Sequence, residues 1–182
     1  MSAGTITRYW KTPIVVDEID LKGITIPSLG DRYATATALT FRVIPTDSVI
    51  DDLNALKTAF LASMNAIAAG QCTPPVPDVD VEVQLWPGGY DLPAASFATD
   101  YIGWCILAAS PAPQHAESGC LSFADPRAGS AMTAMPGLPW GRQVMVRPVP
   151  GAHAVVPGWL TSSVVPMEQH QYAVVAVATA VR

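Results

Sequence analysis

Proline and glycine are the residues that most restrict how this chain can fold. Seventeen prolines and thirteen glycines divide its 182 residues into short segments. Proline cannot donate to a backbone ladder, and glycine weakens the interior of helices and strands, so long elements are confined to stretches that lack both. Short apolar segments separated by such residues are typical of a β-sandwich or barrel. The length suits one domain, and we predict a single domain spanning residues 1–182.

One stretch lacks both residues and has a helical pattern. The polar segment 46–48 follows Pro45 as a helix start signal, and Asp51 and Asp52 suit the positive end of a helix dipole. Apolar residues then recur at three- and four-residue steps, at Val49, Leu53, Leu56, Phe60, Met64 and Ile67. We therefore predict one long helix near residues 48–69 that buttresses a sheet and stops at Gly70.

The remaining apolar segments have strand patterns. Residues 79–85 alternate strictly, which predicts a strand with one buried and one wet face. Residues 101–109 are apolar without alternation, which indicates a buried central strand. Further strands are expected at residues 10–19, 34–44, 121–123, 143–147, 152–156 and 172–179. This order predicts a mainly β fold, a sandwich or distorted jelly roll with a helical buttress.

Composition excludes several functional classes. The chain has a net charge of −5 and no basic cluster, so nucleic acid and membrane are not expected partners. No apolar run is long enough to span a bilayer and residues 1–10 lack a signal pattern, so a cytoplasmic protein is expected. The three cysteines, Cys72, Cys105 and Cys120, form no CxxC pair and indicate neither a zinc site nor a disulfide framework.

Four short blocks carry a resemblance to a known family. They are residues 10–14 (WKTPI), 88–93 (GGYDLP), 123–127 (FADPR), and 146–151 (VRPVPG) followed by 155–160 (VVPGWL). On these blocks the chain resembles small 2-oxoglutarate/Fe(II)-dependent oxygenases. The resemblance implies a double-stranded β-helix, the jelly-roll or cupin-like fold, over most of the chain.

The resemblance also implies where the iron ligands should stand. The family's His-x-His motif follows the GGY block, where this chain has Ala94, Ala95 and Ser96. Its distal histidine matches Ser162, and its co-substrate clamp matches Gln171 or Tyr172. Methyl groups donate no lone pair, neutral hydroxyls are weak ligands for Fe(II), and glutamine cannot replace a bidentate guanidinium. We therefore predict a degenerate member of the family with no metal site and no cofactor.

A relocated metal site has little support in the sequence. His115, His153 and His170 are far apart and have no chelating spacing. His115 and His170 lie in polar loops and are expected to be exposed, whereas His153 lies in a strand and can point into the barrel. Asp91 and Asp100 flank the altered motif, and either can face the cavity.

These substitutions leave the expected cavity between the sheets in place, without a metal. It would be lined by residues 101–105, with Trp159 on the far side. The candidate substrate-binding residues are Ser96, Tyr101, Trp104, Trp159, Ser162 and Gln171. The candidate acid or base residues are Asp91, Asp100, His153 and Tyr172. The 128–141 loop is either a plain connector or a lid over the cavity.

The first functional hypothesis is a metal-independent, non-redox enzyme on an oxygenase-like scaffold. It would cyclise, isomerise or dehydrate a small organic metabolite in a biosynthetic pathway. The first alternative is a catalytically inactive ligand-binding or partner protein, and the second is a genuine Fe(II)/2-oxoglutarate oxygenase. The expected partner is a small-molecule substrate, and a homodimer is left open.

Overall fold

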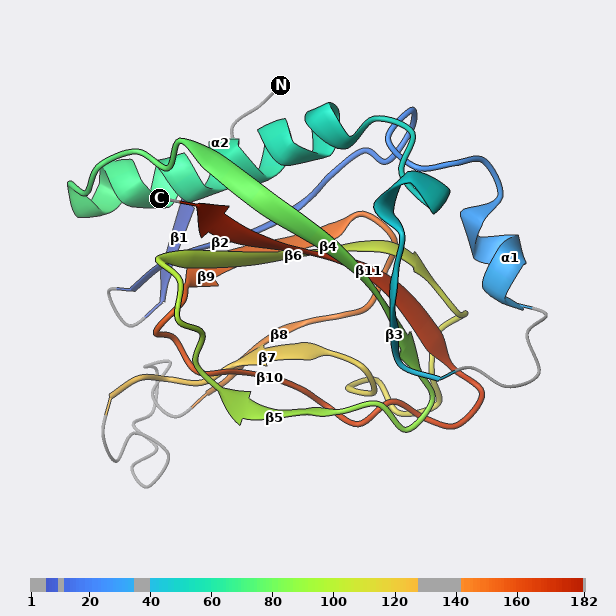
Figure 1. Cartoon of the computed structure of the whole chain (residues 1–182). Coiled ribbons are helices and arrows are strands. Elements are labelled where there is room, and N and C mark those ends of the chain that lie inside the picture. The colour runs from blue at the N-terminus through green and yellow to red at the C-terminus, as the bar shows by residue number, and fades with distance from the viewer. Residues whose placement is uncertain (1–5, 10–11, 35–39, 128–141, 182) are drawn as a thin grey trace.

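Two antiparallel sheets face each other, and one long helix covers the outer face of the larger sheet (Figure 1). The structure is a computed structural model and describes residues 6–9, 12–34, 40–127 and 142–181. The larger sheet has the order β1 (Ile6–Tyr9), β2 (Thr12–Glu18), β9 (Ala152–Pro157), β6 (Tyr101–Ala109), β11 (Tyr172–Val181), β4 (Asp78–Pro87) and β3 (Arg42–Ile44). The smaller sheet has the order β5 (Leu92–Ala95), β10 (Ser162–Val164), β7 (Leu121–Phe123) and β8 (Val144–Val146).

The path of the chain between these sheets defines the fold. β4 lies in the larger sheet, β5 in the smaller and β6 in the larger. The hairpin of β7 and β8 then lies in the smaller sheet, and β9, β10 and β11 again alternate between the two. This winding is a double-stranded β-helix, so the predicted mainly β fold is confirmed.

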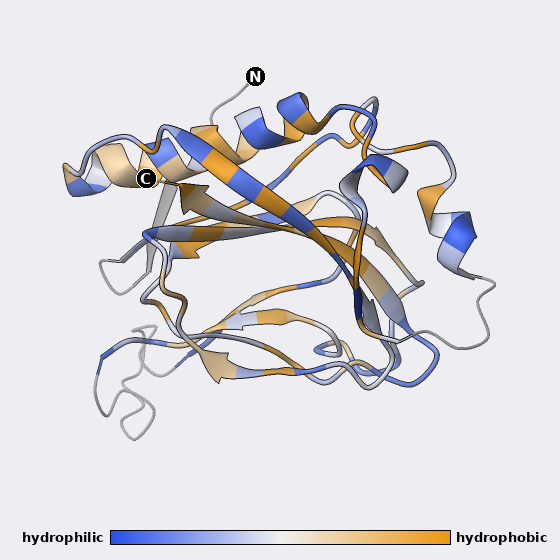
Figure 2. Cartoon of the chain, viewed as in Figure 1, coloured by the Kyte–Doolittle hydropathy of each residue, from blue (hydrophilic) through white to orange (hydrophobic). Residues whose placement is uncertain are grey.

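The helix predicted near residues 48–69 is present, but it starts five residues later, at Leu53. Residues 46–48 form a separate 3₁₀ turn, and α2 spans Leu53–Gln71. Asp52 caps the helix, because its carboxylate accepts a 2.9 Å hydrogen bond from the Ala55 backbone N–H. Cys72, and not Gly70, takes the left-handed conformation that ends the helix, with φ of 56°. The predicted stripe faces the sheet, and Figure 2 shows the polar side of the helix turned outward.

The larger sheet has a hydrophobic core on each of its faces. The helix-side core lies between this sheet and α2 and includes Phe60, Met64 and Val155. The inter-sheet core lies between the two sheets and includes Trp86, Trp104 and Phe123. β4 contributes to both cores, and its alternating colours in Figure 2 show the predicted alternation of polar and apolar residues.

The buried central strand is also confirmed, because β6 is buried from Tyr101 to Ala108. Its side chains nevertheless alternate between the two cores. Tyr101 and Cys105 belong to the helix-side core, whereas Ile102 and Trp104 belong to the inter-sheet core. The expectation that all of residues 101–105 line one cavity is therefore wrong.

Other strand predictions succeed in part. Within the range 34–44, where a strand is expected, the described residues include β3, and Ala34 ends the short helix α1 (Leu29–Ala34). β1, β5 and β10 were not predicted as strands. The proposed lid at 128–141 lies outside the described residues. Within the described part of the chain, no helix is long and apolar enough to cross a membrane.

Candidate functional site

The two segments to which the resemblance assigns iron ligands lie side by side on the smaller sheet. Ser162 of β10 pairs directly with Ala95 of β5 on one side and with Phe123 of β7 on the other. Ser162 is fully buried, and its hydroxyl donates a 3.1 Å hydrogen bond to the Leu160 carbonyl. Ala94 and Ser96 are exposed. Ala95 matches the middle residue of the His-x-His motif, so Ser162 is the one ligand position in this pair, and its hydroxyl already has an acceptor.

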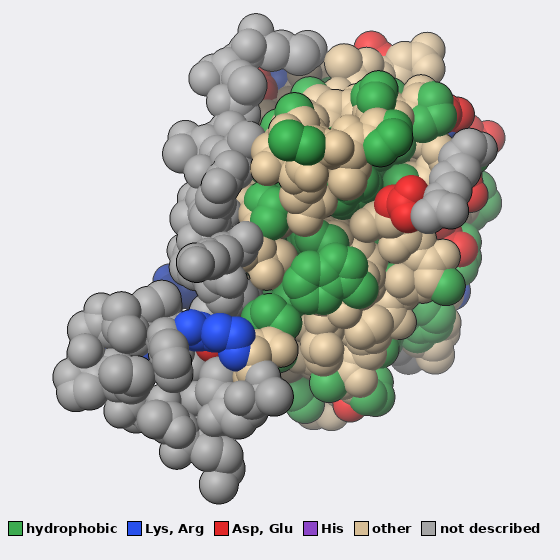
Figure 3. All heavy atoms as spheres, turned by 90° about the vertical axis from the view of Figure 1, so that its left-hand side faces the viewer, with side chains coloured by type: hydrophobic (Ala, Val, Ile, Leu, Met, Phe, Trp, Pro, Cys, Tyr) green, Lys and Arg blue, Asp and Glu red, His purple; other side chains and the backbone are tan. Residues whose placement is uncertain are grey.

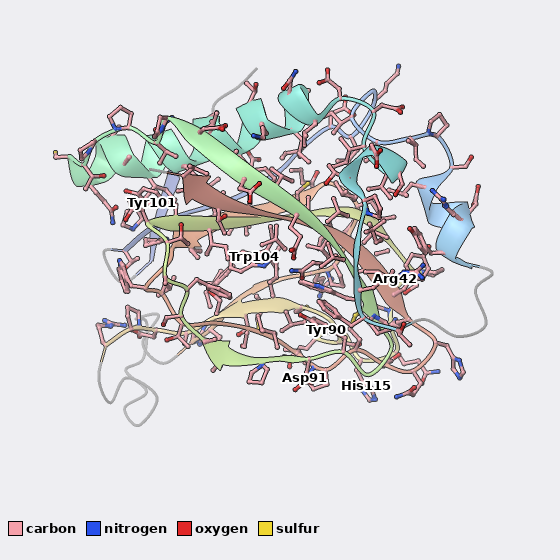
Figure 4. The ribbon with its side chains drawn as sticks, in the orientation of Figure 1. Arg42, Tyr90, Asp91, Tyr101, Trp104 and His115 are labelled. Atoms are coloured by element: carbon pink, nitrogen blue, oxygen red, sulfur yellow. The ribbon has the colours of Figure 1, made fainter. Side chains whose placement is uncertain are left out.

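Aromatic side chains pack beside this pair. Trp104 points from β6 into the space between the sheets (Figure 4) and is 2% exposed. Its ring centroid lies 5.9 Å from that of Phe97 and 5.7 Å from that of Phe123, in edge-to-face and tilted arrangements. Such contacts stabilise a packed interior. Trp104 is therefore a core residue beside the ligand positions, and not the wall of an open iron site.

The residues present do not fit an iron and 2-oxoglutarate site. Among the described residues, no three His, Cys, Asp or Glu side chains lie close enough together to hold a metal ion. The segments outside the description contain none of these residue types in the sequence. At the position of the co-substrate clamp, the Gln171 side chain accepts a 3.0 Å hydrogen bond from the Ser118 hydroxyl and donates a 3.5 Å bond to the Pro111 carbonyl.

A cleft lies at the end of the sandwich where β5 ends and β6 begins. A hollow of about 750 Å³ is lined by residues 97–100, Trp159 and residues 179–180. A second hollow of about 540 Å³ adjoins it and is walled by the proline-rich segment 73–77. Both share Asp100, Trp159 and Ala180, and we call them together the Trp159 cleft. Figure 3 looks onto this end and shows hydrophobic side chains gathered at its centre.

Close backbone contacts fix Trp159 in this cleft. The Gly158 N–H donates a 2.9 Å hydrogen bond to the Asp100 carbonyl, and the Phe97 N–H donates a 2.8 Å bond to the Gly158 carbonyl. A Cβ on residue 158 would lie 2.0 Å from the Thr99 carbonyl oxygen, so this position requires glycine. The following residue, Trp159, is held with its side chain 54% exposed.

Four candidate residues meet at the Trp159 cleft. Asp100 and Trp159 line both hollows, and Tyr101 lines the second. The Ser96 hydroxyl donates a 3.1 Å hydrogen bond to the Trp159 carbonyl. The Tyr101 hydroxyl is held by the Thr73 hydroxyl at 2.9 Å and the Gln71 side-chain oxygen at 3.1 Å.

The other acid or base candidates lie elsewhere. Asp91 is exposed on the turn before β5, well away from Tyr101 (Figure 4). Tyr172 packs against Tyr33 on the helix side, and its hydroxyl donates a 2.7 Å hydrogen bond to the Gly30 carbonyl. Burial raises the pKa of Tyr172, and the charge of Asp31 adds to that increase. The structure thus does not bring Asp91 and Tyr172 together with Asp100.

His153 points away from the space between the sheets, so the expectation that it faces the barrel interior is wrong. Its ring meets Phe60 edge-on at 4.9 Å, and Nε2 lies 3.0 Å from the Ser63 hydroxyl, both residues on α2. Nδ1 is buried without a hydrogen-bond partner among the described residues. Burial lowers the pKa of His153 to about 4, although the backbone of Trp104 and the charge of Asp17 oppose the decrease. His115 and His170 are exposed, as expected.

Sequence reasoning missed several residues that shape these surfaces. Phe97 and Phe123 pack around Trp104; Phe97 follows the block 88–93, and Phe123 opens the block 123–127. Arg147 lines a pocket at the other end of the sandwich. Arg147 belongs to the block 146–151, which was used only as evidence of the resemblance and not searched for site residues.

Comparisons with known proteins agree with this fold. No protein family model and no curated protein sequence matches the chain. The non-heme α-ketoglutarate-dependent epimerase SnoN from nogalamycin biosynthesis is similar in structure, with a TM-score of 0.57 and 15% identity over 94% of this chain and 78% of that chain. SnoN in complex with Fe³⁺, α-ketoglutarate and nogalamycin RO has a TM-score of 0.55 at 15% identity, over 94% and 79% of the two chains.

A Pseudomonas putida prolyl-4-hydroxylase has a TM-score of 0.49 and 18% identity over 68% of this chain. The match covers 65% of the hydroxylase, slightly less than two thirds of its length. At these identities the likeness concerns the fold alone. The chain therefore has the double-stranded β-helix scaffold that is also found in 2-oxoglutarate-dependent non-heme enzymes.

Proposed function

We propose that this chain binds a small organic molecule on an oxygenase-like scaffold without iron or 2-oxoglutarate. The observation that carries the proposal is the set of side chains at the positions where the resemblance expects ligands, which are Ala94, Ser96 and Ser162. A metal site on this fold needs imidazole or carboxylate groups there, and one methyl group with two hydroxyls cannot supply them.

The Trp159 cleft is the proposed binding site. Its half-exposed indole offers a flat apolar surface, and the adjoining segment 73–77 contributes prolines. Backbone and hydroxyl groups of the rim supply polar contacts. The volumes of the two hollows are those of small-molecule sites, which combine an apolar wall with a few polar groups.

The first test measures metal and co-substrate directly. We expect purified protein to carry iron far below stoichiometry, and 2-oxoglutarate with added Mn(II) to leave its melting temperature unchanged.

A fragment screen by NMR is the second test, and the chemical-shift changes should cluster on residues 97–101, 159 and 179–181. Trp159→Ala should abolish these shifts, whereas Phe41→Ala, which removes another exposed aromatic ring at 48% exposure, should not. Near-stoichiometric iron, or fragments that bind Trp159→Ala as well as the wild type, would overturn the proposal.

A metal-independent, non-redox enzyme is the second candidate function. One observation favours it, since Asp100 places a carboxylate at the cleft. That group would act as acid or base in a cyclisation, isomerisation or dehydration, and the similar fold of the epimerase SnoN supports a biosynthetic setting. The other candidate acid or base residues, Asp91, His153 and Tyr172, do not line the cleft, so the geometry favours ligand binding over catalysis. Turnover of a bound molecule in the presence of a chelator, lost in Asp100→Asn, would decide for the enzyme.

A further inference from the structure

A second pocket lies at the opposite ends of β6 and β11. It has a volume of about 550 Å³ and is formed by three connections, residues 109–116, 147–150 and 167–172. Four prolines line it, namely Pro111, Pro113, Pro148 and Pro150. Proline fixes φ, so these walls lose little conformational freedom when a ligand binds. We call this site the proline-lined pocket.

The neutral polar side chains of this pocket already have hydrogen-bond partners in the protein. The Ser110 hydroxyl accepts a 3.2 Å hydrogen bond from the Tyr172 backbone N–H. Gln171 is held by Ser118 and the Pro111 carbonyl, and the Tyr172 hydroxyl is held by the Gly30 carbonyl. These groups build the pocket and leave its surface largely apolar.

Arg147 is the charged residue that lines the pocket. Its guanidinium forms no ion pair or side-chain hydrogen bond with any described residue. Two carboxylates lie in the surroundings. The Glu168 carboxylate accepts hydrogen bonds from the backbone N–H groups of Gln114 and His115. The charge of Glu117 raises the pKa of Cys120, whereas the charge of Arg147 lowers it.

A different hollow, lined by Asp17 and Glu18, lies on the other side of Arg147, and neither of these residues forms an ion pair with Arg147.

An unpaired guanidinium beside an apolar, rigid pocket suits a ligand that has an anionic head and an apolar body. The cation binds a carboxylate through charge-assisted hydrogen bonds, and the prolines contact an apolar body.

We propose that the proline-lined pocket binds a small organic monocarboxylate with an apolar tail, with its carboxylate on Arg147. This site is separate from the Trp159 cleft and does not depend on the function proposed there. The probes that test it are octanoate and 1-octanol, which share a chain and differ in the charge of the head group.

Isothermal titration calorimetry of the full chain provides the test. Octanoate should bind more tightly than 1-octanol, and Arg147→Gln should weaken octanoate about tenfold while leaving 1-octanol unchanged, because a charge-assisted contact is lost. Arg147→Lys keeps the charge but not the planar guanidinium, so it should weaken octanoate binding less than Arg147→Gln does. Arg142→Gln removes another exposed arginine, which precedes β8 whereas Arg147 follows it, and should change binding by less than about twofold.

Three outcomes would overturn the proposal. The first is that octanoate and 1-octanol bind with equal affinity, and the second is that Arg142→Gln and Arg147→Gln lose the same octanoate affinity. The third is that octanoate does not bind the wild type. Because Arg147 is exposed, its substitution should leave the circular dichroism spectrum unchanged. Trp159→Ala should bind octanoate normally, which separates this proposal from the function proposed for the Trp159 cleft.

Discussion

His153 is an imidazole enclosed between α2 and the larger sheet. It is 2% exposed and touches Phe60 and Ser63, while its Nδ1 atom has no hydrogen-bond partner among the described residues. A charged imidazole in this place would lose its hydration without gaining a close counter-ion, since Asp17 acts on it only through its field. The residue is therefore neutral in the folded protein at pH 7.

This burial predicts how stability depends on pH. The pKa of His153 is about 4 in the folded state and near 6.5 in the unfolded chain, so below pH 6.5 the unfolded state binds a proton that the folded state excludes. The free energy of unfolding should fall as pH drops from about 6.5 to 4, by up to ~1.4 kcal/mol per pH unit from this residue. Urea unfolding at several pH values measures the effect.

Two variants isolate the contribution of this residue. In His153→Leu the free energy of unfolding should fall less between pH 6.5 and 5, because leucine cannot take up a proton. His115→Gln, which replaces an exposed histidine, should keep the wild-type dependence. If His153→Leu and the wild type lose stability in parallel over this range, the imidazole is not the group responsible.

The register of a strand decides which of the sequence-based site predictions succeed. Asp100 and Trp159 reach the cleft because backbone contacts around Gly158 bring their two connections together. His153 and Tyr172 lie inside strands, where a shift of one residue moves a side chain to the other face of the sheet. The sequence does not specify that register when both faces are apolar, as in β9 and β11.

Element length explains part of the outcome of the strand predictions, although β7 and β8, with three residues each, were also predicted. The long elements α2, β4 and β6 carry periodic patterns over many residues and were predicted. β5 and β10 have four and three residues, with no alternation to detect. Their strand conformation depends on pairing with each other and with β7, which is a tertiary effect. Of the strands that were missed, β5 holds Ala95 and β10 holds Ser162.

The start of α2 gives a prediction at the scale of an element. The Asp52 carboxylate satisfies a helix N–H that would otherwise lack an acceptor, so Asp52→Ala should lower the free energy of unfolding by about 1 kcal/mol. Asp52→Asn keeps a side-chain acceptor and should lose less. Asp51→Ala removes a neighbouring exposed carboxylate without removing the cap. Thermal unfolding of the four proteins measures the difference, and an equal loss in Asp51→Ala would show that charge and not capping matters.

The whole molecule is three layers built around one shared sheet. α2 covers one face of the larger sheet and the smaller sheet covers the other, so each face of β6 and β11 supports a different core. Phe60 anchors the helix-side core and Phe123 the inter-sheet core, and both are fully buried. Because the same strands serve both cores, loss of one core should weaken the support of the other.

This arrangement predicts that the three layers unfold together. Phe60→Ala and Phe123→Ala should each lower the free energy of unfolding by about 3–5 kcal/mol, through lost burial and a cavity. Val43→Ala, at a side chain 54% exposed on the edge strand β3, should cost much less. In each variant, helical circular dichroism and tryptophan fluorescence should report the same urea midpoint. If Phe60→Ala loses its helical signal at lower urea than its fluorescence signal, α2 unfolds separately and the shared sheet does not couple the two cores.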